Sequence, residues 1–166
     1  MYTPKPISPA GVPGALEKAE RYRLLNEPSA AESICQDVLA VEPDNQQATI
    51  MLLLAMTDQF PEGAAEGERR ARDLLPRIRD EYKRAYYEGV VCERRGRAHL
   101  RSGHGGSGEL AYEWLTKAMG CYERAESLAP AGNDEAILRW NTCARMIDGR
   151  DHVRPGVAEA YEPSFD

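Results

Sequence analysis

Three prolines that follow apolar or small residues at similar offsets constrain the fold of this chain most. Counting back from Pro43, such residues stand two, five, eight and twelve positions earlier. All four offsets recur before Pro130, and those of two, five and twelve recur before Pro76. Steps of three and four residues place side chains on one face of an α-helix, and proline blocks helix continuation. The pattern predicts three helices that end alike, each with a narrow face for close packing against a neighbouring helix.

The composition favours helices throughout the chain. Valine and isoleucine are sparse, whereas alanine, leucine, glutamate and arginine fill long stretches between segments rich in proline and glycine. No segment alternates convincingly between apolar and polar residues, as a half-buried strand does. The 166 residues suit one domain. An all-α domain is therefore expected.

Pro43 and Pro76 lie 33 residues apart, and here the chain resembles the tetratricopeptide repeat (TPR) family. In that family a unit of about 34 residues pairs a helix A with a helix B, and helix B ends at such a proline. Further residues match the family pattern: Gly89, Gly96, Tyr122, Ala125 and Pro130. The resemblance implies a right-handed α-solenoid of about three helical hairpins over residues 13–148, closed by a C-terminal capping helix.

The third repeat is longer than the family pattern. Gly89 and Pro130 are 41 residues apart, where the repeat has about 24, so about seventeen residues are inserted between Gly96 and Ala118. Both flanks of the insertion have helical character, and SGHGGSG between them is a turn sequence. We expect an extended hairpin over residues 80–129, followed by the capping helix within AGNDEAILRWNTCARMI.

The two ends of the chain lack helical periodicity. Residues 1–12 are rich in proline and predict a flexible N-terminal arm, and residues 149–166 predict a flexible acidic tail. Residues 157–166, VAEAYEPSFD, combine acidic and aromatic side chains. This composition fits a basic groove, which predicts an internal competitor for a partner. The alternative is a frayed end that aids solubility.

Several functional classes are not indicated. The chain has no recognisable nucleophile with its base and no acid and base pair, so we expect no enzyme and no cofactor. The four cysteines form no CxxC pair and the histidines are scattered, which predicts buried reduced thiols and no metal site. A net charge of −6 and the absence of a long apolar run favour a cytoplasmic protein that binds neither nucleic acid nor membrane.

Charge is segregated along the chain. Residues 69–101 contain eleven of the 21 Lys and Arg residues and only five acids, a net charge of +6. Within this segment basic, aromatic and apolar residues follow three-and-four spacing on one helical face. The TPR resemblance implies that much of this face lines the concave groove. The candidate peptide-binding residues are Lys83, Tyr86, Val90, Arg94 and Arg97.

These residues predict a protein-interaction module, an adaptor or scaffold whose groove takes an extended, acidic peptide segment of a protein partner. The simpler alternative is an ordinary solvated face. A second functional hypothesis is a structural homodimer formed through the extended hairpin. It rests on the aromatic residues Tyr112, Trp114 and Tyr122 on or beside the extension.

Overall fold

The computed structural model describes residues 2–156 of the protein, without the side chains of residues 61–65. Within that part of the chain it contains seven α-helices, two 3-10 helices, η1 (Pro9–Gly11) and η2 (Leu75–Arg77), and no strand. The α-helices are α1 (Val12–Leu24), α2 (Pro28–Val41), α3 (Gln46–Asp58), α4 (Phe60–Leu74), α5 (Glu81–Ser102), α6 (Ser107–Leu128) and α7 (Glu135–Asp148). The predicted all-α class is confirmed.

Each of the three prolines follows the end of a helix, as the offsets predict. Helices α2 and α6 end two residues before Pro43 and Pro130, and α4 ends two residues before Pro76, which lies in η2. The predicted packing residues five, eight and twelve positions before the prolines are fully buried where the structure describes them: Ala31, Cys35, Val38, Ala71, Ala118, Tyr122 and Ala125. Two positions before the prolines, Leu74 is buried, Val41 is half-buried and Leu128 is exposed. The proline pattern thus marks both where these helices end and which face each one buries.

Two helix starts are fixed by short polar side chains. The Asn45 carboxamide oxygen accepts a hydrogen bond of 2.8 Å from the Ala48 backbone N–H at the start of α3. The Asp80 carboxylate accepts one of 2.7 Å from the Lys83 N–H at the start of α5. Such caps satisfy N–H groups that have no partner within the helix.

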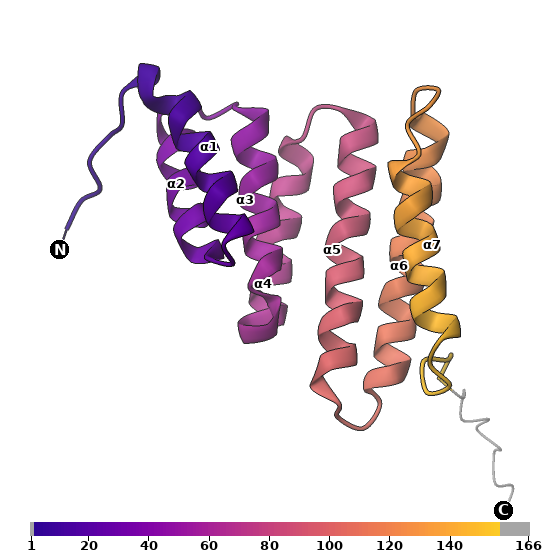
Figure 1. The fold of residues 1–166 in the computed structure, drawn as a ribbon. Coiled ribbons are helices and arrows are strands. Elements are labelled where there is room, and N and C mark those ends of the chain that lie inside the picture. The colour runs from indigo at the N-terminus through magenta and orange to yellow at the C-terminus, as the bar shows by residue number, and fades with distance from the viewer. Residues whose placement is uncertain (1, 157–166) are drawn as a thin grey trace, which may run out of the picture.

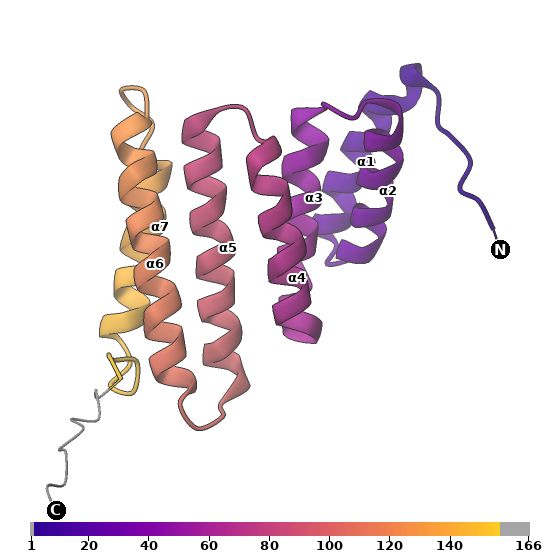
Figure 2. The same ribbon diagram turned by 180° about the vertical axis from the view of Figure 1, so that it is seen from behind.

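Consecutive helices run antiparallel and pack against their neighbours in sequence (Figure 1). Helices α1, α3, α5 and α7 form one layer, which we call the odd layer. Helices α2, α4 and α6 form the other layer, as the two opposite views show (Figure 2). Contacts of α3 with both α1 and α5 connect the odd layer.

Helices α5 and α6 form the long hairpin that the insertion predicts. Their connection is short, and Gly103 (φ 63°) and Gly106 (φ 78°) adopt the left-handed conformation that favours glycine. The hairpin extends beyond the end of α4 (Figure 1). The two helices approach each other closely, because a Cβ atom at Gly89 would lie 2.5 Å from the Tyr122 ring and one at Gly96 would lie 2.9 Å from Leu115.

The buried side chains form two main clusters that meet at α5. One cluster joins α1 to α5 and includes Leu53, Phe60 and Val91. The other joins α5, α6 and α7 and includes Val90 and Tyr122. Helix α5 thus contributes adjacent residues to both clusters and holds the two halves of the chain together.

The segment after α7 also contacts the helical body. Val153 is buried in the cluster of α5, α6 and α7, and the His152 backbone leaves no room for a side chain at Gly108. The predicted acidic tail therefore contributes at least Val153 to the core, while residues 157–166 lie outside the described part of the chain. All four cysteines are buried and unpaired, as predicted. None of the described helices combines the length and the apolar character needed to cross a bilayer.

We predict that Gly89→Ala destabilises the fold by about 1–3 kcal/mol, the usual cost of overpacking a filled interface. The added methyl group meets the Tyr122 ring, which is fully buried and cannot move aside. Gly120→Ala is the matched control, because Gly120 lies in α6 with open space around it. This control should raise stability by about 0.5–1 kcal/mol. Urea unfolding followed by circular dichroism measures both changes, and equal stabilities would contradict the close α5–α6 contact.

Candidate functional site

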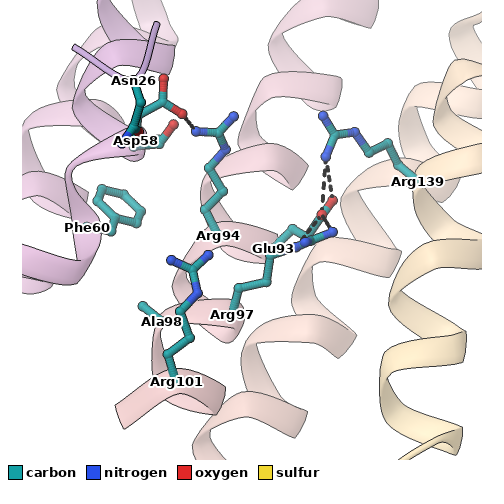
Figure 3. A pocket seen from close by; sticks show the side chains of 10 residues that line it. Asn26, Asp58, Phe60, Glu93, Arg94, Arg97, Ala98, Arg101 and Arg139 are labelled. Carbon is teal, nitrogen blue, oxygen red and sulfur yellow. Dashed lines mark hydrogen bonds and ion pairs between the residues drawn. The ribbon is translucent and has the colours of Figure 1, made fainter. Parts of the chain in front are cut away.

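The candidate site lies on the odd layer, where α5 passes between α3 and α7. Arg94, Arg97 and Arg101 follow one another at steps of three and four residues, so they share one side of α5. Figure 3 shows Arg94 directed toward Asp58 of α3, and Arg139 of α7 directed toward Glu93. Local helical spacing and the position of α5 between two helices together gather these guanidinium groups.

A cavity of about 350 Å³ opens between these side chains (Figure 3). Its charged lining residues are Asp58, Glu93, Arg94, Arg97, Arg101 and Arg139. A second cavity of about 620 Å³, next to the α1–α2 turn, shares Asn26, Asp58 and Arg101 with the first. The two cavities therefore adjoin and form one polar depression along α5.

Glu93 is the most buried charged side chain of the site, with no exposed surface. Its Oε2 atom accepts a hydrogen bond of 2.7 Å from the Tyr122 hydroxyl. Arg139 donates to both carboxylate oxygens at 3.1 and 3.2 Å, and Arg97 donates to Oε1 at 2.9 Å. A buried carboxylate is tolerated only when it is paired and hydrogen-bonded in this way.

The partners of Glu93 are held in definite protonation states. Burial and the Glu93 charge raise the pKa of the Tyr122 hydroxyl far above its ordinary value, so Tyr122 stays a donor. Burial alone would lower the pKa of Arg139, but the Glu93 charge and a hydrogen bond to Tyr86 outweigh it and raise this pKa. Arg139 thus stays a cation.

Asp58 is the second anion of the site. Its Oδ2 atom accepts a hydrogen bond of 2.8 Å from Arg23 of α1, and its Oδ1 atom pairs with Arg94 of α5. The three side chains are 18 to 23% exposed. Asp58 therefore bridges three helices of the odd layer, α1, α3 and α5.

Positive charge exceeds negative charge at the site. The cations that line the two cavities are Arg94, Arg97, Arg101 and Arg139, Arg23 pairs with Asp58, and the anions are Glu27, Asp58 and Glu93. Burial, together with the charges of Arg23, Arg139 and Arg97, lowers the pKa of Arg94 to about 10. A guanidinium group nevertheless keeps its proton in proteins. The surroundings of Arg94 therefore favour the arrival of a further anion.

The structure separates the predicted peptide-binding residues. Arg94 and Arg97 line the cavity, and the Tyr86 hydroxyl lies 3.4 Å from Arg139 Nε. Val90 is fully buried between α5 and α6, so it presents no surface to a ligand. Lys83 is exposed about three helical turns from Arg94, outside the lining of the cavity.

Sequence reasoning missed Asp58, Glu93 and Arg139 as members of the site. The sequence could have indicated Asp58, because it is the single charged residue of the otherwise uncharged and largely apolar α3. A lone charge on a buried helix usually has a partner. Glu93 carried no such signal, since two arginines follow it directly in the sequence. Arg139 lies between Leu138 and Trp140, but nothing in the sequence pairs it with Glu93.

The basic segment 69–101 is partly compensated by ion pairs with acids outside it, four of which join distant parts of the chain. Six of its arginines pair with acids outside the segment: Arg69, Arg70, Arg72, Arg79, Arg94 and Arg95. Glu68, for example, receives both Arg72 and Arg95. The charge segregation of the sequence therefore does not become a uniformly basic surface.

Metal binding has no support in the described part of the chain. Among residues 2–156, no group of three or more His, Cys, Asp or Glu side chains is placed to hold a metal ion. The predicted docking of the acidic tail involves residues 157–166, which lie outside the described residues.

Comparison of the chain with protein-family models, with curated proteins and with solved structures gives no match. The TPR resemblance therefore stays a prediction that rests on the proline spacing and on the residues of this chain.

We predict that Glu93→Gln lowers the free energy of unfolding by about 1.5–3 kcal/mol, the range for losing a hydrogen bond to a charged group. The substitution leaves Arg97 and Arg139 without their shared anion. Glu113→Gln is the control, since Glu113 is exposed on α6 and should change stability by less than about 0.5 kcal/mol. Thermal and urea unfolding provide the measurement. Equal stability of the two variants would mean that the buried pairs contribute nothing to the fold.

Proposed function

We propose that this protein is a protein-interaction module, not an enzyme, and that it binds an extended acidic peptide segment along the odd layer. We further propose that its helices form a short solenoid of the TPR kind, with the odd layer as the concave side. The observation that carries the binding proposal is the polar depression along α5, which is lined by four arginines and three carboxylates, with Arg23 paired to one of the carboxylates.

Charge complementarity supports an acidic ligand. Arginine side chains form bidentate hydrogen bonds with carboxylates, and those of the site are directed by the ion pairs that they already form. The two adjoining cavities give the depression a length that suits an extended chain better than a small molecule. Tyr86, beside Arg139, adds an aromatic edge at which a peptide side chain can pack.

Self-association through the extended hairpin receives no comparable support. Tyr122 is fully buried within the chain. The Trp114 ring is covered by cations of the same chain, with Lys117 Nζ 4.6 Å and Arg72 Cζ 5.6 Å from its centroid. The aromatic residues that suggested a dimer thus have intramolecular partners. Light scattering at high concentration tests this alternative directly.

We predict that Arg101→Ala weakens the binding of acidic peptides by about 1 kcal/mol, or roughly fivefold, as expected for one exposed ion pair. Arg101 is exposed and lines both cavities, so the substitution removes a charge from the site without disturbing the core. Arg69→Ala is the matched control, because it removes the same charge from α4, away from the cavity. Isothermal titration with a panel of extended peptides of increasing Asp and Glu content measures the affinities.

Binding should weaken as salt is added, because the attraction between exposed charges is screened. Affinity that does not depend on peptide charge, or that falls equally in the Arg101 and Arg69 variants, would contradict the proposed site.

A further inference from the structure

We propose that the cavity between α3, α5 and α7 binds a phosphate group that the partner peptide carries as phosphoserine or phosphothreonine. This inference rests on the proposed peptide-binding function and specifies the chemistry of its central contact.

The first argument is the amount of charge that the site leaves uncompensated. Asp58 is already shared by Arg23 and Arg94, and Glu93 is shared by Arg97 and Arg139. Each internal carboxylate therefore serves two arginines, and Arg101 adds a further cation. One more carboxylate would bring a single negative charge to this surplus. A phosphorylated side chain brings about −1.5 to −2 at neutral pH, together with three strong acceptor oxygens.

The second argument is how the arginines are arranged. Arg94, Arg97 and Arg101 approach the cavity from α5, and Arg139 approaches it from α7 (Figure 3). Donors that reach the cavity from two helices, and that turn from Asp58 and Glu93 toward an incoming ligand, suit a tetrahedral anion, whose oxygens point in several directions. A planar carboxylate is matched by a single guanidinium fork.

The third argument is space. A volume of about 350 Å³ is much larger than the roughly 30 Å³ that one water molecule occupies in the liquid. A phosphate group of five heavy atoms occupies part of this volume and leaves room for the side chain that carries it. Ala98, which is half-buried, provides apolar surface in the lining for that aliphatic part.

Asp58 has a specific role in this proposal. It is the internal anion that holds Arg94 and Arg23 while the cavity has no ligand, and it competes with an incoming phosphate for the same guanidinium groups. Removing its charge should therefore strengthen phosphate binding, whereas removing Arg101 should weaken it. The net charge of the protein predicts the same two signs, so the Arg69 control, which removes one positive charge away from the cavity, is needed to assign the effect of Arg101 to the site.

A phosphodiester of nucleic acid is the less suitable source of the phosphate. Each of its phosphates carries one negative charge, and contact with a long nucleic acid requires a basic surface. Here six of the ten arginines of the basic segment pair with acids outside the segment, so it does not form a continuous basic surface. A single-stranded oligonucleotide is therefore included in the test as a competing ligand.

The test is isothermal titration of the full chain with three peptides that share acidic flanks and differ at one central residue, serine, glutamate or phosphoserine. We expect the phosphoserine peptide to bind about tenfold more tightly than the glutamate peptide, which corresponds to one additional charge-assisted hydrogen bond. Its affinity should fall between pH 7.5 and pH 5, because the second phosphate pKa is about 6 and the arginines stay charged. The affinity of the glutamate peptide should change less, since the ordinary pKa of its carboxyl groups is about 4.3.

Two variants locate the phosphate. Arg101→Gln should reduce the preference for phosphoserine over glutamate, while the control Arg69→Gln should leave it unchanged. Asp58→Asn should increase the affinity for phosphoserine, provided that circular dichroism shows a folded protein. If Asp58→Asn does not fold, the comparison of the Arg101 and Arg69 variants still decides the location.

The outcomes separate this inference from the proposed function. Equal or tighter binding of the glutamate peptide would overturn the phosphate proposal and leave acidic peptide binding intact. A preference for phosphoserine that survives Arg101→Gln unchanged would overturn the assigned cavity. Tighter binding of the oligonucleotide than of the phosphopeptide would overturn the proposal that a peptide carries the phosphate group. Absence of binding to all three peptides would refute the proposed function itself.

Discussion

A carboxylate buried without any contact with water is the constraint on which the rest of the structure depends. Glu93 would strongly destabilise the fold if it were left alone, so its partners have to arrive together. Tyr122 comes from α6, Arg139 from α7 and Arg97 from α5 itself. Satisfying this one group therefore fixes how α6 and α7 are rotated against α5. The glycine at position 89 allows the Tyr122 ring to come close enough.

The same pairs that hold the helices together also prepare a surface. An isolated arginine on a helix samples many rotamers, and ordering it on binding costs free energy. Here Asp58 and Glu93 hold four arginines in place before any ligand arrives. The carboxylates orient these cations without neutralising all of them. Stability and the proposed peptide binding therefore depend on one network of charges, and substitutions at its centre should affect both.

The ion pairs of the folded chain show why a cluster of basic residues in the sequence does not predict a basic surface. Residues 69–101 carry a net charge of +6, yet α4 and α5 place most of these arginines beside acids from other segments. Arg70 pairs with Glu32 of α2, and Arg79 pairs with Asp44 in the α2–α3 connection. Basic residues that cluster in the sequence thus lie beside acidic residues in the folded chain, because neighbouring elements place opposite charges next to each other.

The sequence by itself determined the helices, their ends and the long third hairpin. These features depend on local steric and packing rules, such as the block that proline imposes and the three-and-four spacing of buried residues, which can be read over one or two helical turns. Only the tertiary structure decided which charges meet. Asp58 reaches Arg23 across 35 positions, and Glu93 reaches Arg139 across 46. It also decided that Val90 is buried and that Lys83 lies apart from the arginines. Such contacts depend on how each helix is rotated against its neighbours, and that rotation is set by the packing of the whole chain.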